Sequence, residues 1–509
     1  MSQAPLPQQT LIAVVGTGAM GAGIAQVAAA AGHTVKLLDA RSDAAIRAVT
    51  GIRSQFAKLA EKGKMSTEAA EAAGQRLVAV NQLSDLADAG LVVEAIVENL
   101  EAKQKLYADL EGIVSSECIF GTNTSSISVT AIGAALKRPE RLAGLHFFNP
   151  APLMALVEII SGLATDKAVA DTLFATANAW GKTAVHAKST PGFIVNRVAR
   201  PYYAEALRVA QEGAADYATI DACCREAGGF RMGPFELMDM IGHDVNFAVT
   251  RSVWSAFYHD PRFLPSLIQQ ELVAAGFLGK KSGRGFYDYR EGAVKPEPAS
   301  EAAQAVRGRI VLCGEGPLEE VLAERLGHAH LSYSRAPASD GRVAEINGTV
   351  LYVTDGRTAT RRAAETGVAN TLLVDLALDY GKATRLAIAV ADQCAPEAAD
   401  QGVALLQAAG FAVSRLGDVP GLAVMRTVAM LANEAADAVN QGVCDAAGAD
   451  AAMRLGVNYP RGPLAWADTV GLPAIRDVLA NLGQAYGEDR YRISPLIQQK
   501  VYAGKALHA

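Results

Sequence analysis

The stretch LIAVVGTGAMGAGIAQVAAAAGHTVKLLD, from Leu11 to Asp39, decides the fold of the first part of the chain. Its opening apolar residues predict a buried strand, and Gly16, Gly18 and Gly21 complete the spacing G-x-G-x-x-G at the start of an alanine-rich helix. The first glycine makes the tight turn, the second lets the backbone approach a pyrophosphate, and the third allows close packing of helix on strand. The stretch therefore predicts a Rossmann unit that binds a dinucleotide.

Asp39 indicates which dinucleotide is bound. It ends a second predicted strand, residues 34–38, and lies 21 residues after Gly18 (39 − 18 = 21), about the interval expected for the acid that binds the adenosine ribose. A carboxylate at this point repels a 2′-phosphate, so the sequence favours NAD over NADP. Ala19 and Met20, at the N-terminus of the predicted helix, belong to the same phosphate-binding turn.

Length, charge and cysteine content narrow the class of protein. A chain of 509 residues is too long for one core, and about 150 residues per domain suggests three or four domains. The net charge of −6 gives no reason to expect a nucleic acid or a membrane as partner. The first residues lack the basic start and apolar core of a leader, so we expect a cytoplasmic protein. The six cysteines have no metal-type spacing, so we expect free thiols and no metal site.

The first part of the chain alternates strands and helices, which is the pattern of an α/β domain. A long helical stretch is expected at residues 44–73, and further strands at residues 91–97, 118–121, 144–150 and 155–160. From Gly192 to about Ala275 the apolar spacing is helical throughout. This change marks a second domain that is all-α.

The helical domain occurs twice in the sequence. P-G-F-I-V-N-R at residues 191–197 matches P-G-L-A-V-M-R at residues 420–426, an offset of 229. Gly233-Pro234 falls on Gly462-Pro463 at the same offset, and L-I-Q-Q at residues 267–270 recurs there too. Between the copies lies another α/β unit whose first turn reads G-E-G-P-L-E. It lacks the complete glycine signature, so we expect no dinucleotide there.

These observations predict a fold that is α/β plus all-α, with four domains. They are an NAD-binding Rossmann domain at residues 1–190, a helical domain at 191–290, a reduced Rossmann-like domain at 303–415 and a second helical copy at 416–509. The segment around residues 291–302 is rich in proline and charge and is predicted to be an exposed linker.

Several longer motifs point to one family. They are G-T-G-A-M-G-A-G-I-A, V-V-E-A-I-V-E-N-L, N-T-S-S, G-L-H-F-F-N-P, P-G-F-I-V-N-R, M-G-P-F-E-L-M-D and K-K-S-G-R-G-F-Y. Through them, residues 11–289 resemble the L-3-hydroxyacyl-CoA dehydrogenase family, oxidoreductases that use NAD in β-oxidation and related CoA-thioester pathways. The tandem helical domain resembles bacterial two-copy members, which include the 3-hydroxybutyryl-CoA and 3-hydroxyadipyl-CoA dehydrogenases of phenylacetate and other aromatic catabolism.

The resemblance implies a set of catalytic residues. His146, in G-L-H-F-F-N-P, corresponds to the general base, which takes the hydroxyl proton as hydride moves to the nicotinamide. Glu158 is its expected partner, because a carboxylate on an apolar strand needs one and would orient the ring. Ser125 and Asn196 correspond to the residues that hold the reacting oxygen in line.

The resemblance also assigns residues that bind cofactor and substrate. The expected cofactor contacts are Glu98, Lys103, Asn149 and Lys281. Lys58 and Lys62 are expected to bind the 3′-phosphate ADP part of CoA, and Ser125 is expected to contact the acyl-CoA thioester as well. Solvated lysines on a helix face are the plain alternative for the last pair.

The second helical copy departs from the catalytic pattern. Asn196 falls on Met425, and Glu236 falls on Ala465. We therefore expect the second copy to be structural and to pack on the first within one chain, replacing the dimer contact that the helical domain makes in single-copy members. Further self-association into a homo-oligomer is not excluded by this arrangement.

Two alternatives to an acyl-CoA dehydrogenase are consistent with the predicted fold. A non-catalytic NAD-binding module for regulation or assembly would not need Ser125, His146, Glu158 and Asn196 together. A dehydrogenase of free hydroxyacids would need a positively charged substrate clamp, and the motifs offer no obvious one. The sequence leaves open the acyl chain length, a terminal carboxylate on the substrate and the physiological direction.

Overall fold

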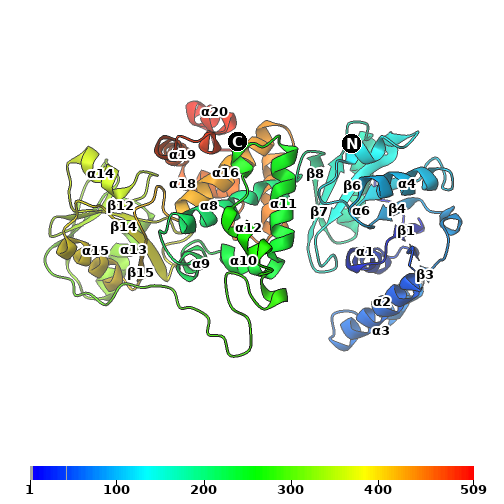
Figure 1. Cartoon of the computed structure of the whole chain (residues 1–509), viewed down its shortest axis with the longest axis horizontal. Helices are drawn as coiled ribbons and strands as arrows, with labels where there is room; N and C mark the ends of the chain where they lie inside the picture. The colour runs from blue at the N-terminus through cyan, green and yellow to red at the C-terminus, as the bar shows by residue number, and fades with distance from the viewer. Residues whose placement is uncertain (1–3, 42) are drawn as a thin grey trace. The chain divides into compact units, whose positions relative to one another are not determined.

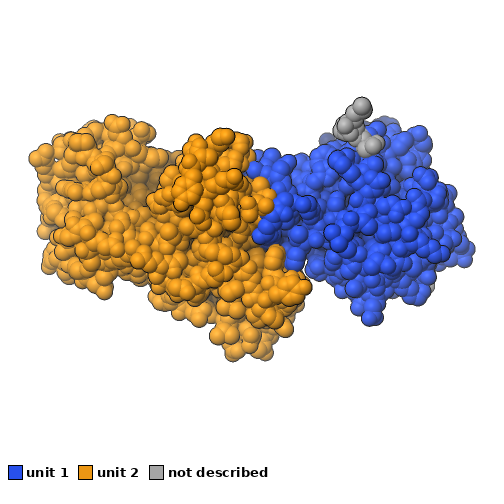
Figure 2. All heavy atoms as spheres, turned by 90° about the horizontal axis from the view of Figure 1, so that it is seen from above, with its two compact units in different colours: residues 1–197, 441–457 blue, residues 198–440, 458–509 orange. Residues whose placement is uncertain are grey.

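The computed structural model describes residues 4–41 and 43–509. The chain forms two compact units, residues 1–197 with 441–457, and residues 198–440 with 458–509 (Figure 2). The first unit therefore contains the predicted dinucleotide-binding domain and a piece of the second helical copy. The predicted division into four domains stays a prediction, because these units follow three-dimensional contacts and not the sequence repeat.

The first unit is built on an eight-stranded sheet of order β3-β2-β1-β4-β5-β6-β7-β8. Its strands are β1 (Ile12–Val15), β2 (Val35–Leu38), β3 (Leu77–Ala79), β4 (Leu91–Glu94), β5 (Ile119–Thr122), β6 (Leu142–Phe147), β7 (Leu156–Ser161) and β8 (Thr183–Lys188). Neighbours from β3 to β6 are parallel, β6 and β7 are antiparallel, and β7 and β8 are parallel. The strand order reverses between β1 and β4, which is where open α/β sheets bind ligands.

The helices that accompany this sheet are α1 (Ala19–Ala30), α2 (Ala44–Glu61), α3 (Thr67–Gln75), α4 (Leu100–Glu111), α5 (Val129–Gly133), α6 (Lys167–Ala179) and α17 (Ala446–Gly456) (Figure 1). Side chains from α1, α2 and α6 share one apolar core with the strands. Strands β1 and β4 are buried at every residue, as expected for a parallel sheet covered on both faces.

Two expected elements have different ends in the structure. The helical stretch expected at residues 44–73 is divided into two helices, because α2 ends at Glu61, Gly63 adopts a φ of +65°, and Ser66 caps the separate helix α3 by accepting from the Ala69 N–H. The strand expected at residues 91–97 is also too long. It ends at Glu94, whose side chain accepts from the Ile96 N–H and draws the backbone away from the sheet.

The second unit contains a seven-stranded sheet of order β10-β9-β11-β12-β13-β14-β15. Its strands are β9 (Ile310–Cys313), β10 (Tyr333–Ala336), β11 (Arg342–Ile346), β12 (Thr349–Val353), β13 (Thr371–Val374), β14 (Arg385–Val390) and β15 (Ala412–Arg415), and its helices are α13 (Pro317–His328), α14 (Ala359–Thr366) and α15 (Pro396–Ala408). Strand β11 pairs antiparallel with both β9 and β12. It therefore occupies the place beside β9 that a parallel strand needs to form a nucleotide crevice, in agreement with the missing glycine signature.

The remaining helices form the helical part of the second unit. They are α8 (Arg200–Gln211), α9 (Tyr217–Glu226), α10 (Pro234–Ile241), α11 (His243–Ala256) and α12 (Leu267–Ala274) from the first copy, and α16 (Val424–Asn440), α18 (Pro463–Val470), α19 (Leu472–Tyr486) and α20 (Pro495–Ala503) from the second. Helix α16 is buried from Val424 to Ala438, and it packs against α8 of the other copy as well as α18, α19 and α20. A helix buried on all sides is the centre of its domain.

The repeat extends further back than the sequence indicated. Strand β14 and helix α15 begin and end at the repeat offset from β7 and α6, and β13 begins at the same offset from β6. Helix α18 stands in the same relation to α10 at both ends. The α/β unit between the helical copies is therefore a second version of the last strands of the first sheet, joined to its own helical copy.

Each helical copy packs one helix on the sheet of the other half. Helix α9 of the first copy contacts β14, and α17 of the second copy contacts β7 and β8. The N–H of Gly417 donates to the carbonyl of Ala214 (2.8 Å), and the N–H of Lys188 donates to the carbonyl of Val443 (2.9 Å). The two hydrogen bonds correspond through the repeat. Gly417 is the counterpart of Lys188, and Val443 is the counterpart of Ala214, since each pair differs by 229 residues.

The predicted linker is exposed only in its first part. Residues 291–297 are exposed, but the N–H of Ala299 donates to Thr219 (2.8 Å) and its carbonyl accepts from Ser414 (2.6 Å). The end of the linker is therefore held by hydrogen bonds to α9 and β15 within the second unit. No helix among the described residues has the length and apolarity to cross a membrane. The cysteines of the described residues are free thiols. Cys394 and Cys444 are half-buried, and the others are buried.

Candidate active site

The glycine turn has the geometry that the motif requires. Gly16 has a φ of +93°, and a Cβ on it would lie 2.5 Å from the carbonyl oxygen of Ala95. A Cβ on Gly21 would lie 1.8 Å from the carbonyl oxygen of Gly16. A Cβ on Gly18, in contrast, would meet only open space. Two glycines therefore serve packing, and the third leaves the N-terminus of α1 open to a phosphate group.

Asp39 is held beside this turn as an ionised acceptor. Its Oδ2 accepts from the N–H and the hydroxyl of Thr17, both at 2.8 Å, and its Oδ1 accepts from the N–H and Nε of Arg41, both at 3.0 Å. The Arg41 hydrogen bonds, aided by Thr17, outweigh burial and hold the pKa of Asp39 far below its usual range. The carboxylate at the end of β2 is therefore fixed and negative.

Glu94 is a site residue that the sequence analysis missed. It is fully buried at the end of β4, where it accepts from Lys103 Nζ (2.6 Å), the Thr122 hydroxyl (2.7 Å) and the Ile96 N–H (2.8 Å). The signal was present, since a carboxylate after the apolar run L-V-V needs a buried cation. Lys103 is only 1% exposed, and its ammonium compensates the charge of Glu94.

Glu98 organises the loop that carries Ser125. Its Oε1 accepts from the Thr124 hydroxyl (2.6 Å) and from the N–H groups of Ser125 (2.9 Å) and Ser126 (3.0 Å), while Lys103 Nζ lies 3.3 Å from Oε2. Burial alone would raise the pKa of Glu98, but the Thr124 hydrogen bond, the Lys103 charge and the two N–H donors lower it to about 2. Glu98 is therefore a charged clamp on the loop that follows β5.

His146 and Glu158 face each other across the antiparallel pair β6 and β7. His146 Nδ1 lies 2.6 Å from Glu158 Oε2, and the two side chains are 6% and 1% exposed. The rings of Phe148 and Phe193 lie 4.5 Å and 5.9 Å from the imidazole, measured between centroids. With Nδ1 bound to a carboxylate, Nε2 is the nitrogen left to exchange a proton with a ligand.

A short backbone segment links this pair to the other predicted residues. The second oxygen of Glu158 accepts from the N–H groups of Ile194 (3.1 Å) and Val195 (3.0 Å), at the start of the short helix α7 (Val195–Val198). The next residue, Asn196, donates from Nδ2 to the carbonyl of Ser125 (3.4 Å). The structure therefore brings Ser125, His146, Glu158 and Asn196 together within the first unit.

The other predicted residues are more scattered. Asn149 is exposed just after β6, Lys58 is exposed on α2, and Lys62 is exposed at the end of that helix. Lys281 belongs to the second unit, where its Nζ lies 2.5 Å from Asp244 Oδ1. The roles of these four residues stay predictions.

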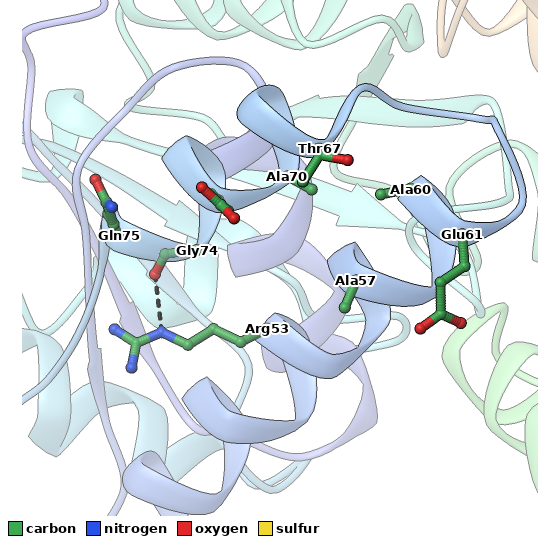
Figure 3. A pocket seen from close by; sticks show the side chains of 9 residues that line it. Arg53, Ala57, Ala60, Glu61, Thr67, Ala70, Gly74 and Gln75 are labelled. Carbon is green, nitrogen blue, oxygen red and sulfur yellow. Dashed lines mark hydrogen bonds between the residues drawn. The ribbon is translucent and has the colours of Figure 1, made fainter.

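Two hollows lie along helix α2. A groove of about 910 Å³ is lined by α1, by the face of α2 that carries Phe56 and Leu59, and by the loop with Leu153. A cavity of about 560 Å³ separates α2 from α3, and Figure 3 shows Arg53 at its edge donating to the carbonyl of Gly74 (2.9 Å). Glu61 and Glu71 line this second hollow, which makes it a poor place for a phosphate.

The second half has a different pair at the positions of the base and its acid. At the offset of the repeat, Asp375 corresponds to His146, and Ala387 corresponds to Glu158. Asp375 is fully buried and accepts from the N–H groups of Ala423 (3.0 Å), Val424 (2.8 Å) and Met425 (2.9 Å). Burial raises its pKa to about 6 against these donors. A carboxylate thus holds the same turn into the helical copy, but no imidazole accompanies it.

Family comparisons agree with this architecture. Residues 11–190 match the 3-hydroxyacyl-CoA dehydrogenase NAD-binding domain, and residues 192–289 and 421–508 each match the C-terminal domain of that family. Residues 351–420 match the reduced Rossmann-fold domain of 3-hydroxybutyryl-CoA dehydrogenase. The chain therefore belongs to the 3-hydroxyacyl-CoA dehydrogenase family.

Relatives of two lengths were found. The 3-hydroxyadipyl-CoA dehydrogenase of Escherichia coli K12 is 45% identical over 490 residues, which are 96% of this chain and 97% of that protein. The probable 3-hydroxybutyryl-CoA dehydrogenase of Bacillus subtilis 168 is 40% identical over 280 residues, which are 55% of this chain but 97% of that protein. The second protein is therefore about half as long and corresponds to a single-copy member.

A solved structure shares the whole architecture. The crystal structure of 3-hydroxybutyryl-CoA dehydrogenase from Escherichia coli K12 matches with a TM-score of 0.89 and 44% identity over 98% of this chain and 99% of that one. The predicted family, the fold class, the NAD cofactor and the assignment as an NAD-dependent 3-hydroxyacyl-CoA dehydrogenase are confirmed.

Glu98→Ala tests the clamp on the Ser125 loop. Without the carboxylate the loop loses its acceptors and Ser125 moves, so kcat/KM should fall about 10- to 100-fold, with most of the change in kcat. Glu101→Ala, exposed in the first turn of the following helix α4, is the matched control. Steady-state NADH absorbance measures the effect, and an unchanged kcat would contradict the clamp.

The pH dependence of stability gives a second readout of Glu98. Its pKa of about 2 in the folded protein lies below the ordinary 4.5, so its contribution to stability is present above pH 4.5 and is lost as the pH falls toward 2. The Tm of Glu98→Ala should therefore lie below that of the parent at neutral pH, and the difference should shrink across this acidic range.

Proposed function

We propose that His146 is the general base in the oxidation of (S)-3-hydroxyacyl-CoA to 3-oxoacyl-CoA, with Glu158 as the acid that orients it. The 2.6 Å contact between His146 Nδ1 and Glu158 Oε2 carries this proposal. It fixes the ring, leaves Nε2 toward the substrate side and compensates the positive charge that forms when the imidazole takes a proton.

The residues that fit the cofactor lie along the open end of the first sheet. The turn from Gly16 to Gly21 would bind the pyrophosphate, Asp39 the adenosine ribose, and Glu98 and Asn149 the nicotinamide side. NAD supplies the acceptor for the hydride that leaves the substrate carbon. The chain itself would remove the hydroxyl proton through His146 Nε2.

Ser125 and Asn196 would hold the reacting oxygen. Asn196 already donates to the Ser125 carbonyl, and Glu98 accepts from the Ser125 N–H, so the Asn196 side chain and the Ser125 backbone are set by hydrogen bonds before substrate binds. Such preorganised donors stabilise the charge that develops on oxygen as its proton leaves. The buried position of His146 keeps bulk water from competing for that proton.

We propose that the CoA arm follows α2, with Lys58 and Lys62 toward its 3′-phosphate. The groove of about 910 Å³ beside that helix is lined largely by apolar side chains, which suits the extended arm of a CoA thioester. The two E. coli comparisons bear different acyl names, 3-hydroxyadipyl and 3-hydroxybutyryl, and both are candidate substrates here. A panel of 3-oxoacyl-CoA thioesters with NADH, with and without a terminal carboxylate, decides between them by kcat/KM.

His146→Gln tests the base. The variant should retain NAD binding and lower kcat about 10²- to 10⁴-fold, the usual share of acid–base catalysis. NADH absorbance gives kcat, and fluorescence titration gives NAD affinity. His328→Gln, exposed at the end of α13, is the control. Full activity in His146→Gln would refute the assignment.

Asp39→Ala tests cofactor choice. The parent should prefer NAD, because the fixed carboxylate of Asp39 accepts from ribose hydroxyls and repels a 2′-phosphate. The variant should lose about tenfold in kcat/KM with NAD and most of its discrimination against NADP. Asp43→Ala, exposed at the start of α2, serves for comparison. Equal efficiency of the parent with both cofactors would count against the proposal.

We propose further that the two halves form a covalent pseudo-dimer, in which the second helical copy replaces a partner subunit. Support comes from buried contacts that recur with the halves exchanged. Glu205 accepts from Tyr491 (2.9 Å), and Glu434 accepts from Arg262 (3.1 Å). Since 434 − 205 and 491 − 262 both equal 229, the two contacts use the same pair of positions. Exchange of this kind is the signature of an isologous interface.

A buried ion pair adds to this contact. Arg426, at 0% exposure, donates from Nε to Glu205 (2.7 Å) and from its other nitrogens to Tyr486 (2.9 Å) and Tyr491 (2.8 Å). Arg426 corresponds to Arg197 by the repeat.

A cytoplasmic location and further self-association through other surfaces stay predictions from the sequence.

Deletion of residues 420–509 tests the pseudo-dimer. It would leave Glu205 buried without a cation and uncover the apolar surface that α16 covers, so the truncated chain should aggregate or associate in pairs. Sedimentation velocity of the truncated and full-length chains measures this. A soluble, monomeric and fully active fragment would contradict the proposal.

A further inference from the structure

The second unit contains a small polar cavity that catalysis does not use. It has a volume of about 170 Å³ and is lined by residues of α8, α11 and the start of α12, together with Arg490 from the second copy. Three of the lining residues are arginines, namely Arg200, Arg208 and Arg490. No carboxylate is among the described residues that line it. The cavity is therefore lined by basic side chains from both helical copies.

Two buried polar groups that line this cavity make no hydrogen bond. The Nε of Arg490 has no acceptor within the described chain, and the carboxylate oxygen that it faces, on Glu488, lies 3.7 Å away. Arg490 is only 4% exposed. The hydroxyl of Ser266 is also buried and has no partner there, and it does not cap helix α12, which begins at the next residue. Unsatisfied buried donors are costly and point to a missing acceptor.

The arginines around the cavity are deeply embedded. Arg200 is 5% exposed and donates to the Thr250 hydroxyl (2.9 Å), and burial lowers the pKa of its guanidinium. Arg208 donates to both oxygens of Glu488, at 2.7 and 2.8 Å, so its own charge is compensated. The guanidinium groups of Arg200 and Arg490 and the N-terminus of α12 therefore border the cavity.

The repeat shows that the fold does not require these groups. The positions that correspond to Arg200 and Thr250 in the second copy are Ala429 and Leu479, both fully buried. The position that corresponds to Ser266 is Pro495. The second copy thus has apolar side chains at these three positions, and they cost far less to bury than an arginine. Packing therefore does not explain why the first copy has polar side chains at these positions.

We propose that this cavity binds a small oxyanion, a phosphate or a short carboxylate, which accepts from Arg490 Nε and the Ser266 hydroxyl. The volume admits an ion of this size but not a nucleotide or a CoA arm. Guanidinium groups, a hydroxyl and a helix N-terminus are the donors that such anions use in proteins. Because Arg490 comes from the second helical copy and Ser266 from the first, the bound anion joins the two copies.

Calorimetric titration of the full-length protein with inorganic phosphate, and separately with malonate, tests the site. Sodium chloride keeps the ionic strength constant. We expect saturable binding of one anion per chain, a rise in Tm with that anion above the rise in chloride, and a preference that identifies phosphate or carboxylate as the natural group.

Ser266→Ala and Arg490→Gln should each weaken binding about tenfold or more, and Arg251→Gln, exposed on α11, should not. Ser266→Ala removes a hydroxyl without a partner, so this variant should fold normally and keep the test valid if Arg490→Gln does not fold. Absence of saturable binding in the parent, or equal binding by the parent and Ser266→Ala, would overturn the proposal.

Discussion

The buried carboxylate of Glu158 is the contact on which the active site depends. One oxygen binds the imidazole of His146, and the other accepts from the N–H groups of Ile194 and Val195. A charge this deep in the protein must be satisfied on every side, which is why the antiparallel pair β6 and β7 and the entry to the helical domain are fixed together. The proposed base is therefore oriented by the same carboxylate that holds the turn into the helical domain.

The second half holds the corresponding turn with a carboxylate at a different position and has no imidazole there. Asp375 stands at the position of His146 and binds three N–H groups of the corresponding turn, while Ala387 stands at the position of Glu158. The carboxylate of the first half lies on β7, whereas that of the second half follows β13, the counterpart of β6. It still accepts from the N–H groups of the turn, but it stands where the first half has the imidazole. Strand β11 pairs antiparallel with β9, whereas in the first sheet the parallel strand β4 lies beside β1, so the two halves differ at this edge as well.

The two halves depend on each other for packing. Helix α17 of the second half packs on β7, the strand of Glu158, and helix α9 of the first half packs on β14. Gly456 in α17 lies so close to this strand that a Cβ on it would meet Leu156 at 2.7 Å and Val195 at 3.0 Å. The second helical copy therefore supports the strand and the turn that hold Glu158. The polar cavity beside Arg490 shows that the copies also differ where they meet.

The sequence by itself determined the dinucleotide fold, the cofactor, the family and the internal repeat, because glycine spacing, strand-end acids and long motifs are local signals. It placed His146 and Glu158 as a pair only through family resemblance. Only the tertiary structure showed that Glu94 pairs with the buried Lys103 and that Glu98 holds the Ser125 loop. It also showed that the repeat begins within the last strands of the first sheet. These features depend on which distant strands become neighbours, and strand order and reciprocal packing are set by burial of the whole chain, which no short stretch of residues encodes.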